Sequence, residues 1–280
     1  MHPELERLQR QFGWSPESHE AINLAADSSV TEQPAPGGTV FSNAQWTGLD
    51  ELLDGSWWSQ TRNHIISETL HADLATSAIW DIGSGSGIVA EFLIKQGFTV
   101  IGVEPSPVGS LLANRRGVTT LCADFGALVL PANSLDAVSM FDVLEHVSDR
   151  SAVLNEVFRV LRPGGYLIVS VPALQTLWSQ LDESIGHFLR FNKRSIKNEL
   201  SLAGFTITRM GYFFLLTVLP LLLLRVLPYR LGKRQALATN ATLAARGGFL
   251  GDLAAWVERH IALRTPLGSS MLVIARKPAG

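Results

Sequence analysis

The chain has 280 residues, 46% of them hydrophobic and 17% charged, with a formal net charge of −2. This length and composition favour one globular domain with added segments, and a mildly acidic chain offers no electrostatic footprint for a nucleic-acid duplex. Nucleic acid is therefore not an expected partner, and the single cysteine, Cys122, excludes an internal disulfide framework.

Residues 1–50 are predicted to form an N-terminal extension and loop ahead of the main domain, which we place over 51–280. The extension is charged and is broken by Pro3 and Pro16, and residues 31–39 form a loop rich in proline and glycine. Because it has no apolar signal-peptide core, we expect a cytoplasmic protein.

Short apolar strands alternate with helical stretches of about 10 to 15 residues from Asp81 onward, which is typical of a parallel sheet covered by helices on both faces. The fold class that we predict is therefore α/β, with a doubly wound, mostly parallel sheet that binds ligands at the carboxyl ends of its strands. The expected helices include 88–96 and 151–161, and the expected strands include 99–103, 167–171, 205–210 and 271–276.

A glycine-rich turn follows the first apolar strand, with glycines at Gly83, Gly85 and Gly87. Such a turn leaves backbone N–H groups free at a helix N-terminus, where a ligand can approach without meeting a Cβ. Glu104 ends the next apolar run about 20 residues on, which is the distance at which an acidic side chain accepts hydrogen bonds from a ribose diol. Together these features predict a nucleoside cofactor.

The glycine spacing indicates which nucleoside. A dinucleotide fingerprint, G-x-G-x-x-G, leaves one more residue before its third glycine than this turn does. With Asp81 opening the motif, the turn resembles motif I of class I S-adenosylmethionine-dependent methyltransferases, whose loop wraps the methionine half of the cofactor. The resemblance, which is greatest to enzymes of the ubiquinone-biosynthesis type, runs from about Trp57 to Lys277.

Three further segments carry this resemblance, namely 122–125 after the third expected strand, 136–147 along the fourth, and 159–166 before the fifth. It implies a seven-stranded Rossmann-like sheet in which the last two strands pair antiparallel at one edge. It also implies S-adenosyl-L-methionine as the cofactor. The implied cofactor-binding residues are Asp81, Gly83, Gly85 and Gly87 for the methionine half, Glu104 for the ribose, Asp124 and Phe125 for the adenine, and in addition Phe141.

A segment between Glu51 and Leu70 carries Trp57, Trp58 and Arg62 at helical spacing ahead of the first strand. Tryptophans at such positions are usually core residues. Methyltransferases of this class lay the corresponding segment over the cofactor, so the resemblance implies that Arg62 reaches the methionine carboxylate.

Candidate catalytic residues follow the fourth strand. If a helical turn begins at Asp142, then Asp142, Glu145 and His146 lie at i, i+3 and i+4 on one face and can share a ligand. Two carboxylates and an imidazole suit a divalent ion such as Mg²⁺, which would lower the pKa of a bound acceptor hydroxyl. The pattern resembles the metal cluster of ubiquinone O-methyltransferases and small-RNA 2′-O-methyltransferases, although Asp142 replaces the usual glutamate there. His187, on the same rim, is the fourth expected ligand.

Two other interpretations of these residues remain open at this point. His146 alone can act as the general base, because an imidazole is partly unprotonated at neutral pH. Alternatively, Asp142 and Glu145 cap the turn and orient His146 or the cofactor. His187 can equally be a loop histidine near Arg190.

An apolar and helical insertion is expected at about 213–265. Its uncharged run is shorter than the roughly 20 residues that a bilayer core requires, and Pro220 interrupts it. Two interpretations remain open for 213–234: peripheral contact with the inner face of the membrane, aided by basic residues, or a lid on the acceptor pocket or homodimer contact. The basic residues are Arg225, Arg230, Lys233 and Arg234.

These features together predict transfer of a methyl group to a hydroxyl of a hydrophobic small-molecule or lipid-like acceptor. The pocket walls are expected from 172–192 and from the insertion. Two alternatives are an NAD-dependent oxidoreductase on a related sheet and a non-catalytic membrane-associated module that binds the cofactor.

Overall fold

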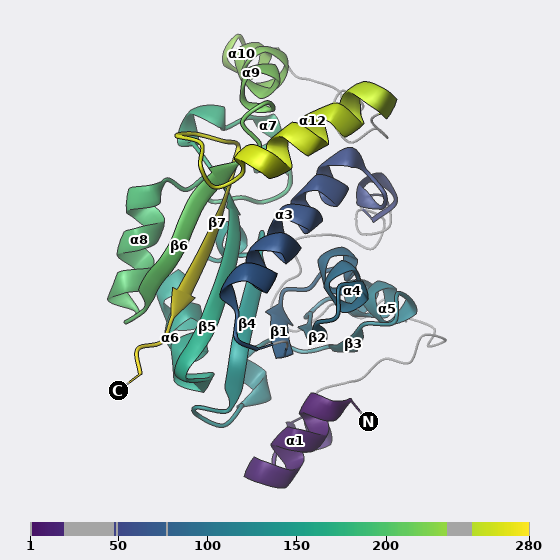
Figure 1. The fold of residues 1–280 in the computed structure, drawn as a ribbon, viewed down its shortest axis with the longest axis vertical. Coiled ribbons are helices and arrows are strands. Elements are labelled where there is room, and N and C mark those ends of the chain that lie inside the picture. The colour runs from purple at the N-terminus through teal and green to yellow at the C-terminus, as the bar shows by residue number, and fades with distance from the viewer. Residues whose placement is uncertain (1, 20–47, 49, 77, 234–247, 280) are drawn as a thin grey trace.

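The computed structural model describes residues 2–19, 48, 50–76, 78–233 and 248–279 (Figure 1). The expected proline- and glycine-rich loop at 31–39 lies outside the described residues, and so does Arg234 of the basic group.

Seven strands form one sheet in the order β3-β2-β1-β4-β5-β7-β6. Strands β1 to β5 run parallel, whereas β7 pairs antiparallel with both β5 and β6. The predicted doubly wound, mostly parallel sheet with an antiparallel pair at one edge is therefore confirmed. The strands are β1 (Ala78–Ile82), β2 (Thr99–Val103), β3 (Thr119–Leu121), β4 (Leu135–Phe141), β5 (Leu161–Pro172), β6 (Thr206–Phe213) and β7 (Ser270–Arg276).

Helices cover both faces of the sheet because successive strand residues point to opposite sides. On one face, Ile79 of β1 packs in a core with α3 (Trp57–Asp73), α4 (Ile88–Lys95) and α5 (Pro107–Arg115). On the other, Trp80 packs in a core with three other helices, and α3 crosses in front of the sheet in Figure 1. Those helices are α1 (Pro3–Phe12), α6 (Arg150–Val160) and α8 (Lys193–Leu202).

The N-terminal helix α1 is part of the main core. Leu5 and Leu8 are buried, and the indole Nε1 of Trp14 donates to the Leu128 carbonyl at 2.8 Å. Figure 1 shows α1 below the sheet, whereas α7, α9, α10 and α12 gather above it, where the parallel strands end. Helix α1 therefore lies at the opposite end of the sheet from the site described below.

Strand β5 begins earlier than the predicted 167–171 because the Pro-Gly-Gly turn is incorporated in it. Leu161 already pairs with Leu135, and the pairing register then shifts before Ala137. A Cβ on Gly165 would lie 3.0 Å from the Asp136 carbonyl oxygen, so only glycine permits this close approach of the two strands.

The segments above the sheet are short helices that pack on one another. Leu177, Leu221 and Val226 form a small core of their own. The structure describes no helix long and apolar enough to cross a bilayer. These segments are η4 (Gln175–Leu177), α7 (Gln180–Ser184), α9 (Val218–Leu221), the π-helical turn η5 (Leu222–Val226), α10 (Leu227–Arg230) and α12 (Gly248–Ile261). The remaining turns are η1 (Pro16–His19), η2 (Gly126–Leu128) and η3 (Leu144–His146).

Candidate active site

A cavity of about 380 Å³ opens at the carboxyl ends of β1, β4 and β5. Its walls come from the glycine loop, the first half of α3, the turn after β4, the segment 172–190 and the insertion between β6 and β7. The last two walls are those expected from the sequence. Most of the lining is apolar, with a small number of charged side chains, as is typical of a small-molecule site.

The glycine loop between β1 and α4 has a backbone that other residues cannot easily adopt. Gly83, Gly85 and Gly87 have φ angles of +69°, +57° and +81°. A Cβ on Gly83 would lie 2.7 Å from Val143 Cγ2, and one on Gly87 would lie 2.9 Å from the Ala113 Cα. The loop therefore needs glycine both for its backbone conformation and for its close contacts with neighbouring residues. Gly83 and Gly85 line the cavity.

Two buried carboxyl groups flank this loop. Asp81 accepts a hydrogen bond from Ser139 Oγ at 2.8 Å, and burial raises the pKa of Asp81 to about 7. Glu104 accepts from the N–H groups of Gly85, at 2.9 Å, and Ser106, at 2.8 Å, and burial raises its pKa to about 7 as well. Glu104 thus lies directly beneath the loop, at the end of β2.

The structure separates the expected cofactor residues into two groups. Asp81, Gly83, Gly85, Phe141 and Arg62 line the cavity. The others do not line it. Gly87 is the N-cap of α4, and Glu104 accepts a hydrogen bond from the glycine loop. After β3, Asp124 is exposed and accepts from the Gly126 N–H, whereas Phe125 is buried in the core.

Arg62 and Asp142 form an ion pair across the cavity. The Arg62 Nη1 lies 2.6 Å from Asp142 Oδ2, and its guanidinium lies 4.3 Å above the ring of Trp58. Ser170 Oγ donates to the other oxygen of Asp142 at 3.2 Å. The predicted helical turn starting at Asp142 is wrong, because Asp142 has a left-handed φ of +56° and the 3₁₀ turn η3 begins only at Leu144. The side chain of Asp142 consequently faces Arg62 and Ser170.

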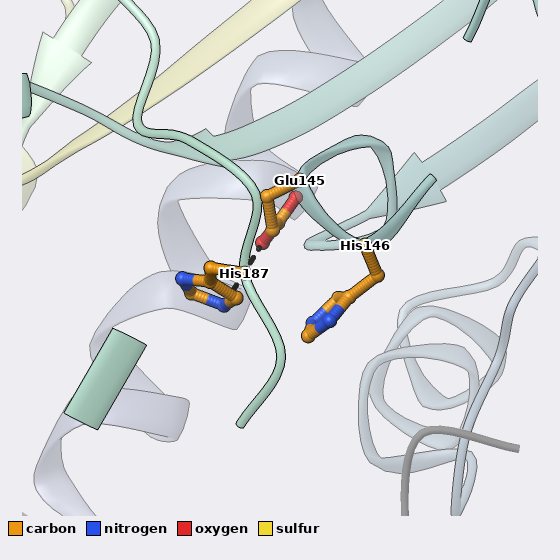
Figure 2. Close-up of side chains that lie close together, drawn as sticks. All are labelled: Glu145, His146 and His187. Atoms are coloured by element: carbon orange, nitrogen blue, oxygen red, sulfur yellow. Dashed lines mark ion pairs between the residues drawn. The ribbon is translucent and has the colours of Figure 1, made fainter. Parts of the chain in front are cut away.

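Glu145, His146 and His187 come together as expected (Figure 2). One ligand atom from each of the three lies within 4.8 Å of the others. The two imidazole rings are 4.7 Å apart at 72°, and His187 Nε2 lies 3.8 Å from Glu145 Oε1. The backbone N–H of Phe188 donates to the Glu145 carbonyl at 2.8 Å, which holds the two segments side by side.

The cluster has unusual electrostatics for a group in contact with a cavity. Glu145 is fully buried, and its carboxylate oxygens make no hydrogen bond to another described residue. Burial, followed by the nearby charge of Asp142, raises the pKa of Glu145 well above its ordinary value. Burial, followed by His187, lowers the pKa of His146 to about 4. His146 is therefore a neutral imidazole at physiological pH.

A second layer orients His187. Its Nδ1 donates to Asp182 Oδ1 at 2.9 Å, which leaves Nε2 facing Glu145, and Arg190 Nε donates to the same Asp182 oxygen at 2.7 Å. Burial by itself would raise the pKa of Asp182, but the hydrogen bond from His187 and the charge of Arg190 outweigh it and lower the pKa to about 2. Asp182 also accepts from the backbone N–H of Ser179 at the start of α7.

Sequence reasoning missed three of these contributors. Ser139 has no motif that marks it as the partner of Asp81. Asp182 could have been found from the Ser179–Asp182 capping pattern ahead of His187. Arg225 was named only among the basic residues of a possible membrane contact, whereas in the structure it is half-buried and lines the cavity.

The chain matches known methyltransferases in sequence. A family model described as a methyltransferase domain matches residues 80–169. A Mycolicibacterium smegmatis protein named as a probable S-adenosylmethionine-dependent methyltransferase is 29% identical over 160 residues, which cover 56% of this chain and 62% of that protein. A ubiquinone biosynthesis O-methyltransferase of Pseudomonas fluorescens is 33% identical over 140 residues, which cover 43% of this chain and 59% of that protein. The match thus spans about three fifths of the length of these relatives.

The fold also has solved counterparts. Phosphoethanolamine N-methyltransferase 2 of Haemonchus contortus, solved with S-adenosyl-L-methionine, superposes with a TM-score of 0.57 at 17% identity, over 86% of this chain and 58% of that one. The strand order and the glycine loop after β1 define a Rossmann-like methyltransferase fold. In strand order, glycine loop and sequence, this chain is similar to class I S-adenosylmethionine-dependent methyltransferases.

Proposed function

We propose that this protein transfers the methyl group of S-adenosyl-L-methionine to a hydroxyl of a hydrophobic, lipid-like acceptor. One observation carries the proposal: the glycine loop that would bind the donor and the neutral imidazole that would take the acceptor proton line the same apolar cavity. The ubiquinone-type relative, named an O-methyltransferase, supports a hydroxyl acceptor.

In this proposal the donor lies along the carboxyl ends of β1 and β2. Asp81 and the loop glycines hold the methionine half, Arg62 meets its carboxylate, and Glu104 accepts from the ribose hydroxyls. Asp124, Phe125 and Phe141 flank the adenosine. The carboxylate of Glu104 has to exchange its bonds to the Gly85 and Ser106 N–H groups for bonds to the ribose, or share them.

Methyl transfer needs alignment of three atoms and removal of one proton. The acceptor oxygen attacks the methyl carbon, the carbon–sulfur bond breaks, and its electron pair leaves on sulfur as a neutral thioether. The hydroxyl proton passes to the imidazole of His146, which is unprotonated because its pKa is lowered to about 4. Glu145 is the second catalytic candidate, since its carboxyl lies beside both imidazoles.

A divalent ion held by Glu145, His146 and His187 is the alternative to this proton transfer, because an imidazole nitrogen that binds a metal cannot also accept the proton. A fully buried carboxylate without a hydrogen bond fits a metal ligand, and a histidine whose other nitrogen donates to a carboxylate is the usual second layer of a metal site. Two imidazoles and one carboxylate favour a transition ion such as Zn²⁺ or Mn²⁺ over the expected Mg²⁺. When bound, such an ion would act as a Lewis acid for the acceptor hydroxyl.

Isothermal titration with S-adenosylmethionine and with S-adenosylhomocysteine tests the donor half of the proposal. Heat from both is expected, and no heat from either contradicts it.

Thermal shifts with S-adenosylhomocysteine and with NADH separate this function from an oxidoreductase. Methyl transfer that survives EDTA dialysis, in protein without stoichiometric metal, contradicts the proposed role of a metal ion. Incubation of lipid extracts with the enzyme and a radiolabelled methyl donor identifies the acceptor.

We also propose that 213–234 touches a membrane surface peripherally. Along this segment, Thr217, Leu221 and Arg225 face the cavity, four residues apart, whereas leucines on the other side are exposed. Leu219, Leu223 and Leu231 are 62%, 53% and 65% exposed, and Arg230 and Lys233 beside them are exposed cations. An apolar stripe flanked by basic residues is suited to an anionic lipid interface.

Vesicle sedimentation tests this contact. Replacing Leu219 and Leu223 by serine should abolish binding to phosphatidylglycerol-containing vesicles, whereas Leu202→Ser, at a 79% exposed leucine of α8, should not. Equal sedimentation of all variants contradicts the membrane contact. A dimer that only the Leu219/Leu223 variant loses, measured by light scattering without vesicles, would assign the stripe to a homodimer instead.

A further inference from the structure

Three carboxylates around the cavity are paired with arginines. Asp142 pairs with Arg62 at 2.6 Å, Asp182 with Arg190 at 2.7 Å, and Asp50 with Arg116 at 2.9 Å. Each of these carboxylates therefore already has a guanidinium partner.

Arg225 lines the same cavity without such a partner. Among the residues that the structure describes, Arg225 makes no hydrogen bond and no ion pair, and its Nε is buried without an acceptor. Burial lowers the pKa of Arg225, and Arg190 acts in the same direction, but a guanidinium remains charged in proteins. A buried cation without a hydrogen-bonded anion is expensive for the fold.

The local backbone directs Arg225 inward. The segment enters as α9 and continues as the π-helical turn η5, which includes Arg225, before α10 follows. A π-helical turn shifts the facing of the side chains within it and is frequent at functional sites. Leu221 and Val226 anchor the segment in its small core, so the inward placement of Arg225 is held by packing on both sides.

The neighbours of Arg225 separate it from the donor side. The charged groups that act on it are Arg190 and Asp182, on the wall formed by 172–190. Arg62, by contrast, lies on α3, close to the glycine loop. The next residue of α3, Asn63, donates a hydrogen bond to the carbonyl of Ile88, the first residue of α4. A ligand group at Arg225 therefore belongs to the acceptor side of the cavity.

We propose that Arg225 binds a carboxylate or phosphate group of the acceptor and so selects an anionic amphiphile. The inference rests on the proposed function only in assigning this half of the cavity to the acceptor. A planar guanidinium matches either anion through two parallel hydrogen bonds, and the apolar walls hold the rest of the molecule.

The test uses octanoate, octyl phosphate and octanol, each below its micelle concentration, titrated against the tryptophan fluorescence of the full chain. Trp57 and Trp58 line the cavity and report occupancy. Wild type should bind octanoate or octyl phosphate at least about tenfold more tightly than octanol, as a charge-assisted hydrogen bond implies. The stronger of the two anions identifies carboxylate or phosphate as the natural group.

Variants assign the preference to one residue. Arg225→Met should bring the three affinities within about twofold of one another, because the charged hydrogen bonds are lost, whereas Arg225→Lys retains most of the preference. Arg194→Gln, at an exposed arginine of α8, is the control and should behave as wild type. Equal binding of octanol and both anions by wild type overturns the inference, and so does a preference that survives in Arg225→Met.

Titration with S-adenosylmethionine distinguishes this failure from failure of the proposed function. The donor affinity of Arg225→Met should equal that of wild type. A tenfold loss of donor affinity would show that Arg225 serves the methionine carboxylate, which overturns the inference but leaves methyl transfer intact. No donor binding by wild type, together with a clear anion preference, would contradict the proposed function and support the anion site.

Discussion

The glycine loop and the opposite wall of the cavity are built in different ways. The glycine loop, which we propose holds the donor, is a run of consecutive residues, Asp81 to Gly87, with three positive φ angles. The wall that we propose faces the acceptor collects side chains from three distant segments, represented by Glu145, His187 and Arg225. The comparison teaches that a short motif suffices to set a backbone conformation, whereas a cluster of side chains depends on long-range packing.

The sharpest test of this division is His146→Ala, which should affect the acceptor side only. We expect kcat to fall by about 10² to 10⁴-fold, the usual contribution of a general base, with unchanged affinity for S-adenosylmethionine by isothermal titration. His260→Ala, at an exposed histidine of α12, is the control and should retain full activity. Weaker donor binding in His146→Ala would break the division between the two sides.

Because the glycine loop depends on its backbone conformation and close packing, replacing Gly87 by alanine should destabilise the protein more than replacing Gly97. Gly87→Ala combines a left-handed φ with a contact of 2.9 Å to the Ala113 Cα, so we expect a loss of about 3 kcal/mol in the free energy of unfolding. Gly97→Ala has the same kind of φ, +92°, in open space, and should lose about 1 kcal/mol. Urea denaturation measures both, and equal losses would mean that close packing of the loop is unimportant.

Glu104 is a position on the proposed donor side where a side chain is expected to carry binding energy. Glu104→Ala should weaken S-adenosylmethionine binding by about 1.5 to 3 kcal/mol if the carboxylate accepts both ribose hydroxyls. Glu17→Ala, at an exposed glutamate of η1, provides the control. Unchanged affinity in Glu104→Ala would remove the ribose assignment without affecting the acceptor side.

The smallest expected effect is a pH dependence of donor binding. Since the pKa of Glu104 is raised to about 7, the carboxyl is protonated below pH 7 and ionised above it. Acceptance of two hydroxyl protons requires the ionised form, so the affinity for S-adenosylmethionine should rise about tenfold from pH 6 to pH 8. In Glu104→Gln this rise in affinity should shrink to the contribution of Asp81. A wild-type affinity that does not change between pH 6 and pH 8 would contradict the assignment of Glu104 to the ribose.

Sequence was sufficient for the fold and for the conformation of the glycine loop because both depend on local patterns. Alternating apolar strands and helices predict the layers of the sheet, and Gly83, Gly85 and Gly87 mark a backbone conformation that few other residues adopt. The approach of Glu145, His146 and His187 was also predicted, since all three follow strands that end at the same edge of the sheet.

Only the tertiary structure decided which side chains pair and which remain unpaired. Asp142 was expected beside Glu145, but its left-handed φ turns it toward Arg62 on α3, a contact between segments that no spacing predicts. Arg225 was named with its basic neighbours for a possible membrane contact, but the segment anchored by Leu221 and Val226 places it in the wall of the cavity. The physical reason is that periodicity in a sequence reports the faces of single elements, whereas an ion pair or a buried unpaired charge depends on how separate elements pack together.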